Sequence, residues 1–357
     1  MTTSSEFLGW PTVLSLLLGG QDLSADVAAS AVSEILRGDA TSSQITAFIV
    51  ALRAKGETEE ELAGMLSAVR VAGVAVTLPE NIASRAIDIV GTGGDKSNSV
   101  NVSTMAAFVV AGAGVPVCKH GNRASSSKCG SADVLEALGV AIDLDAADVA
   151  SCLSTTGMGF CLATRFHPSF RHAGPSRREI GVPTAFNLLG PMANPAPIAN
   201  MLVGVAQPSM MHKMAHVLAS RGVTSAWVVH GHGGLDELAL SGANTVVQLR
   251  NGDVSEFMVD AADVGFARAN QADIEGGDAK VNALAVTAVL SSQAGPVRDI
   301  VVLNAAAALV IAGACVDLET GKSLAQQSID SGAAAGVLES LVRHSQELAA
   351  NATSKGA

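Results

Sequence analysis

The sequence contains no tyrosine, and aromatic residues make up only 3% of its 357 residues. A protein that binds single-stranded nucleic acid by base stacking needs aromatic platforms, so this composition excludes that class. Charged residues are also scarce, at 15%, and the acidic excess leaves a formal charge of −11. Because neutralisation of phosphates by basic side chains supplies most nucleic-acid affinity, we expect no nucleic-acid partner.

Cysteine is infrequent too, and no two of the five cysteines stand at C-x-x-C spacing. We therefore expect neither a disulfide framework nor a structural zinc site. The N-terminal residues show no basic leader before an apolar core, so no signal peptide is predicted. The longest apolar run, 300–315, is short and contains Asn304, which predicts a buried helix rather than a membrane span. These features predict a cytoplasmic protein without a membrane partner.

Apolar residues make up 48% of the chain, which is long enough for about two domains of roughly 150 residues each. About the first 75 residues show only helical patterns. Ser24 is placed to cap one helix that ends at Gly38, and Thr58 with Glu61 forms a capping box for another. The sequence therefore predicts a small helical domain over residues 1–80.

From Ala86 onward, short β-branched runs alternate with helical patterns. This alternation predicts an α/β domain with a mostly parallel sheet flanked by helices. We assign this larger domain to residues 81–167 and 195–350, and we expect residues 168–194 to pack on the N-terminal helices. The predicted strands are residues 87–90, 115–118, 159–163, 202–205 and 227–230.

Polar motifs follow the predicted strands, at the edge where open α/β sheets bind ligands. The glycine-rich loop 91–95 lets backbone N–H groups approach a phosphate, and Ser103 and Thr104 open the next helix, whose N-terminus attracts anions. The spacing fits neither a Walker A loop nor G-x-G-x-x-G. A tight strand-to-helix turn that needs glycine is the alternative interpretation.

Two further clusters follow strands. Lys119 can meet a phosphate as a point charge, and His120 and Asn122 offer polar groups to a substrate, although a solvated basic turn is the alternative. Asp236 and Glu237 are adjacent carboxylates that suit Mg²⁺, which takes one or two carboxylates plus water and phosphate oxygens. A solvated acidic pair is the alternative there.

Taken in order, these motifs resemble those of the anthranilate phosphoribosyltransferases of tryptophan biosynthesis, and the resemblance covers nearly the whole chain. The segments that carry it are Gly91 to Asp95, Asn101-Val102-Ser103-Thr104, Lys119 to Ala124, Ser131 to Gly139, Arg165 to Pro168, Arg177 to Gly181, Phe186 to Pro191 with Asn194-Pro195, and Gly234 to Glu237.

The resemblance implies two hinged domains and a homodimer formed through the helices. It implies Mg²⁺-dependent transfer of phosphoribose from phosphoribosyl pyrophosphate to the amine of anthranilate, with release of pyrophosphate. The sequence departs from the family at Lys96, where a small residue is common, and at Phe170, where a tyrosine can occur.

The resemblance also implies roles for individual residues. Arg177 is the expected partner of the anthranilate carboxylate. The expected phosphoribosyl pyrophosphate ligands are Gly91, Thr92, Gly93, Gly94, Asp95, Asn101, Ser103, Thr104, Lys119, Ser126 and Ser127. The expected anthranilate contacts are Gly91, His120, Asn122, His167 and Arg177. The expected metal ligands are Ser103, Asp236 and Glu237.

No serine or cysteine is paired with a base in the manner of a nucleophile, so we expect no acid–base or nucleophilic catalytic residue. Charge stabilisation of the leaving pyrophosphate would dominate instead. Two alternatives remain: a pyrimidine nucleoside phosphorylase, which shares the fold and a glycine-rich loop, and a non-catalytic nucleic-acid-binding relative of the fold.

Overall fold

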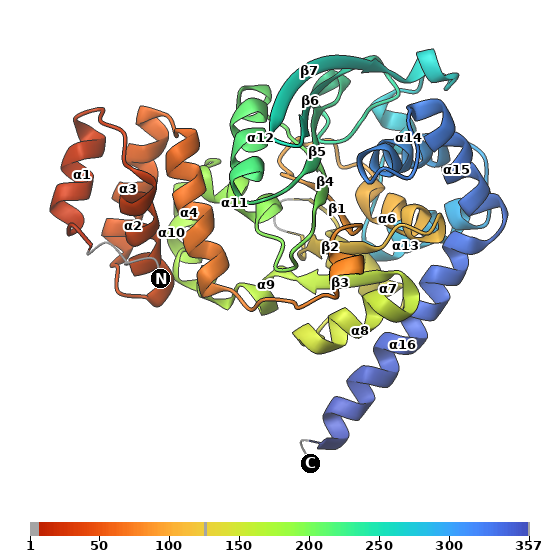
Figure 1. Ribbon diagram of the computed structural model, residues 1–357, viewed down its shortest axis with the longest axis horizontal. Coiled ribbons are helices and arrows are strands. Elements are labelled where there is room, and N and C mark those ends of the chain that lie inside the picture. The colour runs from red at the N-terminus through yellow and green to blue at the C-terminus, as the bar shows by residue number, and fades with distance from the viewer. Residues whose placement is uncertain (1–6, 125–126, 356–357) are drawn as a thin grey trace.

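The computed structural model describes residues 7–124 and 127–355. Its N-terminal part is a helical bundle, on the left in Figure 1, made of α1 (Trp10–Leu18), α2 (Ala25–Arg37), α3 (Ser42–Lys55) and α4 (Glu59–Ala72). The predicted caps are confirmed. Ser24 Oγ accepts a hydrogen bond from Val27 N at 3.4 Å, and α2 ends at Gly38 with φ 84°. Thr58 and Glu61 form the capping box of α4.

The larger part is built on one seven-stranded sheet with the order β3-β2-β1-β4-β5-β6-β7. The first five strands of this order are parallel, and β6 and β7 add an antiparallel edge. The strands are β1 (Ile87–Gly91), β2 (Val117–Gly121), β3 (Met158–Leu162), β4 (Asn200–Gly204), β5 (Ser225–His230), β6 (Ala243–Arg250) and β7 (Asp253–Asp260). This architecture confirms the predicted fold class.

Helices cover both faces of the sheet. Two lie between the sheet and the bundle, α11 (Ala185–Met192) and α12 (Met211–Ser220). On the other side lie α6 (Val102–Gly112) and α14 (Pro296–Ile311) (Figure 1). This part also contains α5 (Glu80–Ala83), α7 (Ser131–Ala137), α8 (Ala146–Thr156), α13 (Ala279–Leu290), α15 (Leu318–Asp330) and α16 (Ala333–Lys355), with 3-10 turns η2 (Pro208–Met210), η3 (His232–Gly234), η4 (Ala261–Val264) and η5 (Gln271–Ile274).

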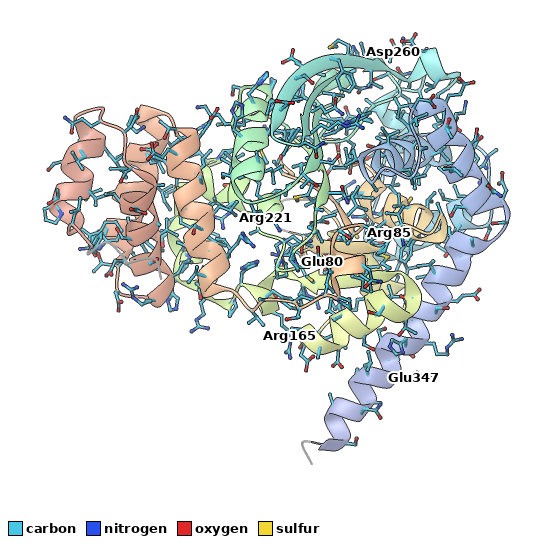
Figure 2. The ribbon with its side chains drawn as sticks, in the orientation of Figure 1. Glu80, Arg85, Arg165, Arg221, Asp260 and Glu347 are labelled. Carbon is cyan, nitrogen blue, oxygen red and sulfur yellow. The ribbon has the colours of Figure 1, made fainter. Side chains whose placement is uncertain are left out.

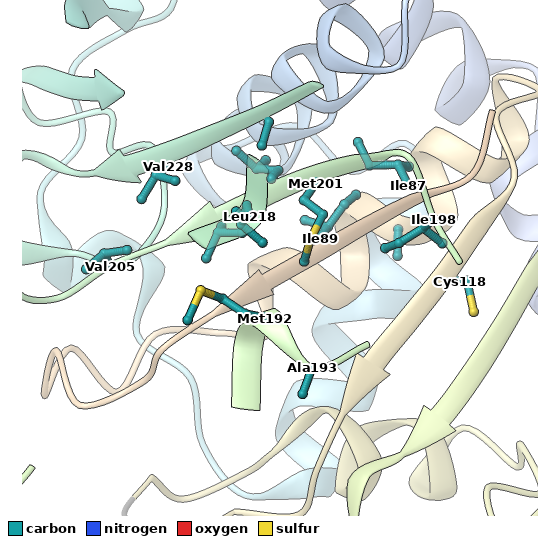
Figure 3. Packing of buried hydrophobic residues seen from close by; sticks show 14 of the residues in the cluster. Ile87, Ile89, Cys118, Met192, Ala193, Ile198, Met201, Val205, Leu218 and Val228 are labelled. Atoms are coloured by element: carbon teal, nitrogen blue, oxygen red, sulfur yellow. The ribbon is translucent and has the colours of Figure 1, made fainter. Parts of the chain in front are cut away.

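The core of the sheet is aliphatic. Figure 3 shows Ile87 and Ile89 of β1 beside Met201 of β4, with Leu218 of α12 packed nearby. All four side chains are buried. This packing makes the central strands rigid, so the loops at their carboxyl ends start from fixed positions.

A separate segment leaves the sheet after β3 and packs on the bundle. It comprises α9 (Ala163–Phe166), η1 (Pro168–His172), α10 (Gly174–Ile180) and α11. Helix α10 contacts α3, η1 contacts α2, and α11 contacts α3 and α4. Where the chain passes between the two parts, Val74 N donates to Phe166 O at 2.8 Å and Val76 N to Pro195 O at 3.2 Å.

Two details of the predicted sheet are wrong. Strand β2 begins and ends later than expected, so Lys119 and His120 lie inside it, paired with Phe160 and Cys161 of β3. The hairpin of β6 and β7 was not anticipated, although Asn251 and Gly252, with φ 52° and 93°, form its tight turn.

The apolar run that contains Asn304 forms most of α14, which is almost entirely buried, as predicted. Across the described ranges, every helix is too short or too polar to cross a membrane.

Candidate active site

The strand order reverses between β1 and β4, and ligands of open α/β sheets bind in the crevice at such a point. Gly91 ends β1 and is paired with Gly204, which ends β4. The glycine-rich loop follows Gly91. The loop 231–242, which we call the acidic loop, follows β5 on the same edge of the sheet and carries Asp236 and Glu237.

The glycine-rich loop is shaped by its backbone. Gly93 and Gly94 have φ of 66° and 82°, a region that glycine enters without strain. Thr92 N donates to Gly204 O at 2.9 Å, which ties the start of the loop to β4. Gly93 N donates to Asp236 Oδ2 at 2.6 Å. The two loops are therefore in direct contact.

The second carboxylate meets the start of α6 and the lysine of β2. Glu237 Oε1 accepts a hydrogen bond from Ser103 N at 3.2 Å. Lys119 Nζ donates to Ser103 Oγ at 3.1 Å and also to Ile89 O. The glycine loop, the helix N-terminus, the lysine and the carboxylate pair thus gather at one place, although they come from four separate segments.

Burial makes this place electrostatically costly for the carboxylates. Burial, and then the charge of Asp95, raises the pKa of Asp236 to about 7. Burial, and then the charge of Asp236, raises the pKa of Glu237 to about 8. Burial also lowers the pKa of Lys119, against the attraction of Asp88 and Glu237. The single positive charge of Lys119 therefore does not balance the negative charges of the neighbouring carboxylates.

This arrangement fits a divalent cation. Asp95 Oδ2 is buried and has no hydrogen-bond partner among the residues that the structure describes. Within those residues, no three His, Cys, Asp or Glu side chains form a metal-binding group. A cation held here would take at most two protein carboxylates and complete its shell with water and phosphate oxygens, which is the usual coordination of Mg²⁺.

Three glycines let the acidic loop lie directly on the sheet edge. A Cβ on Gly204 would lie 1.5 Å from Asp236 O, and one on Gly231 would lie 2.1 Å from Glu237 O. A Cβ on Gly91 would lie 2.4 Å from Asp236 Oδ2. Sequence reasoning missed Gly204 and Gly231, because the pattern around each shows only a strand end.

The other predicted phosphate ligands lie nearby with less specific contacts. Asn101 stands at the N-cap position of α6, but its side chain does not bond to the helix. Instead, its Nδ2 donates to Cys129 O at 3.2 Å and its Oδ1 accepts from Asn282 Nδ2 at 2.8 Å. Thr104 Oγ1 is buried, and no group in the described ranges bonds to it. Ser127 Oγ donates to Cys129 O at 3.4 Å. Ser126 lies outside the described residues.

A row of aromatic rings connects three of the predicted anthranilate contacts. The His120 and His167 rings are 5.2 Å apart, and Phe170 lies 5.9 Å from His167. Phe186 follows at 6.0 Å from Phe170, and the Arg177 guanidinium lies 5.7 Å from the Phe186 ring. Edge-to-face contacts of this kind hold each ring in place.

His120 is held in one neutral form. Its Nδ1 lies 3.1 Å from Gly190 O, a distance at which Nδ1–H donates to the carbonyl. Burial, and then the neighbouring His167, lowers the pKa of His120 to about 3. The other nitrogen, Nε2, is buried and lacks a hydrogen-bond partner in the described part of the chain. It is therefore a free acceptor for a ligand N–H.

Arg177 has no carboxylate partner among the described side chains, and burial lowers its pKa. A half-buried guanidinium of this kind suits a bidentate carboxylate ligand. Asn122 is not part of the ring row. Its side chain is exposed, and its Oδ1 accepts a hydrogen bond from Arg123 N at 2.8 Å.

Buried Asp88 and half-buried Arg221 support the row, and sequence reasoning identified neither. Asp88 accepts hydrogen bonds from His120 N at 3.1 Å and Asn194 Nδ2 at 2.9 Å, and burial raises its pKa to about 6. Arg221 lies on the bundle side of the sheet (Figure 2) and donates to Met192 O at 2.8 Å and Asn194 O at 2.9 Å. Together they fix segment 192–196, which also supplies the partner of His167.

Comparison with known proteins agrees with this arrangement. The helical bundle domain of a glycosyl transferase family matches residues 11–73, and the a/b domain of that family matches residues 83–335. Anthranilate phosphoribosyltransferase of Salinispora arenicola is 52% identical over 334 residues, covering 92% of this chain and 94% of its own. That of Afipia carboxidovorans is 49% identical and covers 92% and 97%.

Solved structures give the same result. Anthranilate phosphoribosyltransferase from Thermus thermophilus matches with a TM-score of 0.88 and 37% identity, over 94% of this chain and 99% of the other. The Saccharomyces cerevisiae enzyme in complex with PRPP and Mg matches with a TM-score of 0.85 and 27% identity, over 95% and 98%. The chain therefore belongs to the anthranilate phosphoribosyltransferase family.

Proposed function

We propose that the chain transfers the phosphoribosyl group of phosphoribosyl pyrophosphate to the amine of anthranilate, with Mg²⁺, as a step of tryptophan biosynthesis. The observation that carries this proposal is the convergence of the glycine-rich loop, Lys119 and the adjacent carboxylates of half-buried Asp236 and buried Glu237 at the strand-order reversal. A cation bridges such carboxylates to a polyphosphate.

The phosphates are assigned to the groups that donate. The backbone N–H groups of the glycine-rich loop, the N-terminus of α6 and the ammonium of Lys119 all present positive charge to this place. The loop residues are Gly91, Thr92, Gly93, Gly94 and Asp95, and the α6 residues are Asn101, Ser103 and Thr104. Ser126 and Ser127 complete the assignment.

The anthranilate is assigned to the ring row. Arg177 binds the carboxylate, and His120, at the other end of the row, offers its free Nε2 to the substrates as an acceptor. His167 and Asn122 border this position, and Gly91 forms its boundary with the phosphate groups. Because His120 is neutral and its Nδ1–H is engaged by Gly190 O, its Nε2 accepts and does not donate.

Asp236, Glu237 and Ser103 are the residues that would hold Mg²⁺. When bound, Mg²⁺ supplies the positive charge that lets pyrophosphate depart from the sugar. The protein itself positions the sugar between the phosphate groups and the amine and excludes water from the reacting carbon. The bond between the sugar carbon and pyrophosphate breaks with its electron pair leaving on pyrophosphate, and the amine nitrogen forms the new bond from the opposite face. The proton that this nitrogen then loses goes to the released pyrophosphate.

No side chain acts as a nucleophile in this proposal. Burial raises the pKa of Cys129 to about 11 and that of Cys161 well above its usual value, so both remain thiols. The rate enhancement comes instead from charge stabilisation and positioning.

The domain division, oligomer and compartment are part of the proposal. Residues 1–80 with 168–194 form the smaller domain, which moves against 81–167 and 195–350 to enclose both substrates. The chain forms a homodimer through its bundle, which exposes Leu18 on α1 and Val50 on α3. It acts in the cytoplasm, where its five free thiols stay reduced.

The test follows the fall in anthranilate fluorescence with phosphoribosyl pyrophosphate, with Mg²⁺ or with excess chelator. The wild-type chain should consume anthranilate only with Mg²⁺. The double variant Asp236→Asn, Glu237→Gln should lose most activity. The matched control, Asp253→Asn with Glu256→Gln, removes the same charge from the exposed edge strand β7. This control should retain wild-type activity.

An active Asp236, Glu237 double variant would contradict the metal assignment. Phosphorolysis of thymidine without anthranilate consumption would contradict the reaction itself and favour a nucleoside phosphorylase.

A further inference from the structure

The acidic loop has two buried asparagines behind it that the proposed reaction does not use. Asn304 of α14 and Asn244 of β6 are both 0% exposed. An asparagine side chain is buried only at a cost unless all of its polar atoms are hydrogen-bonded. The partners of these two side chains therefore show what the burial achieves.

Asn304 binds the residue that follows the carboxylate pair. Its Oδ1 accepts a hydrogen bond from Leu238 N at 2.9 Å, and its Nδ2 donates to Leu238 O at 3.0 Å. The second hydrogen of Nδ2 goes to Ile300 O at 2.9 Å, one turn earlier in the same helix. The amide is thereby fixed to α14 and engages both backbone groups of Leu238.

Asn244 closes the rest of the loop. Its Oδ1 accepts from Ala239 N at 2.7 Å and from His232 N at 3.1 Å. Its Nδ2 donates to Ala239 O at 3.1 Å and to Gly242 O at 3.2 Å. One side chain therefore joins the start, the middle and the end of the acidic loop.

The peptide between Glu237 and Leu238 is held from both sides. Its N–H is bound by Asn304, and its carbonyl oxygen lies where Gly231 leaves room. Because a peptide group is planar, holding both ends fixes its orientation and the backbone angle that directs the Glu237 side chain. The carbonyl of Asp236 lies against Gly204 in the same way.

We propose that Asn304 is a positioning residue for the cation site, and that Asn244 assists it. Asn304 does not touch the cation; it holds the Glu237–Leu238 peptide so that the two carboxylates point at Gly93 N and Ser103 N. This inference rests on the proposed function, since it concerns the same site. Residues that orient metal ligands in this way commonly change metal affinity by about 10- to 100-fold when they are replaced.

The test compares Asn304→Leu, which keeps the side-chain size and removes the hydrogen bonds, with Asn200→Leu. Asn200 is also buried, and its Nδ2 donates to Ala86 O at 3.1 Å, at the start of β4 and the opposite end of the sheet. The probe is Mn²⁺, titrated by electron paramagnetic resonance in the presence of inorganic pyrophosphate. The KM for anthranilate and the Tm are measured on the same samples.

Asn304→Leu should raise the half-saturating Mn²⁺ concentration on the order of tenfold, with less than about a twofold change in the anthranilate KM. Asn200→Leu should lower the Tm and leave Mn²⁺ binding unchanged. If Asn304→Leu does not fold, Asn304→Ser is measured by the same criteria, because a small hydroxyl needs no extra room.

A folded Asn304 variant with wild-type Mn²⁺ binding would overturn the inference, and so would an equal loss in Asn200→Leu. The Asp236→Asn, Glu237→Gln double variant separates this failure from that of the proposed function. If the double variant loses Mn²⁺ and the Asn304 variant does not, only the positioning role fails. If the double variant binds Mn²⁺ normally, the metal assignment itself fails.

Discussion

Gly204→Ala should disable the active site through a single added methyl group. The Cβ would lie 1.5 Å from Asp236 O and 2.3 Å from the carbonyl carbon, whereas Cβ atoms essentially never approach closer than 3.0 Å. Gly204 ends a central strand that is paired on both sides, with Gly91 and with Val229, so the strand cannot retreat. The acidic loop must therefore move away by about 1.5 Å.

This displacement has two measurable consequences. Overpacking of this kind costs about 1–3 kcal/mol of the free energy of unfolding. A misplacement of about 1 Å in a catalytic arrangement costs about 100-fold in rate. We expect kcat to fall by at least that factor and the half-saturating Mg²⁺ concentration to rise, because Asp236 and Glu237 leave their positions together.

The assay is anthranilate fluorescence at a series of Mg²⁺ concentrations, with calorimetry for the Tm. Gly64→Ala is the matched control, because its Cβ would lie 2.0 Å from Ala25 O inside the helical bundle. It should lower the Tm without changing the Mg²⁺ dependence. A Gly204→Ala protein with wild-type kcat and Mg²⁺ dependence would refute the reasoning, whatever its Tm.

Three further predictions concern other parts of the structure. Arg177→Ala should raise the anthranilate KM about 10- to 100-fold, since it removes charge-assisted hydrogen bonds, while the exposed neighbour Arg178→Ala should not. His120 binds fewer protons folded than unfolded, because its folded pKa of about 3 lies below 6.5, so its contribution to stability is lost as pH falls below about 6.5. From pH 7 to pH 5, the free energy of unfolding measured by urea denaturation should fall by about 2 kcal/mol more for the wild type than for His120→Gln. An equal fall in the two proteins would contradict the conclusion that His120 is buried in its neutral form. Glu61→Ala should lower the free energy of unfolding, measured by urea denaturation, by at least about 2 kcal/mol. The reason is that this buried carboxylate accepts hydrogen bonds from two backbone N–H groups and from a lysine ammonium. The control Glu60→Ala, at an exposed position, should lower it much less.

Local patterns in the sequence predicted much of the fold. The caps at Ser24 and Thr58 were correct because an N-cap depends on side chains within three residues of each other. The five parallel strands were found because each is a short β-branched or apolar run bounded by turn residues. The end of β2 was misplaced, since its length depends on pairing with β3 and not on its own residues.

The chemistry of the site followed the same division. Residue types pointed to phosphate and cation ligands, because glycine loops, paired carboxylates and a lysine keep their chemical character in any fold. The pairing of Arg177 with a substrate carboxylate came from the family resemblance instead. The loop contacts made possible by Gly204 and Gly231, and the support from Asn304 and Asp88, could not be found in this way. They arise where segments far apart along the chain approach within a few ångströms, and such an approach leaves no periodic pattern in either segment.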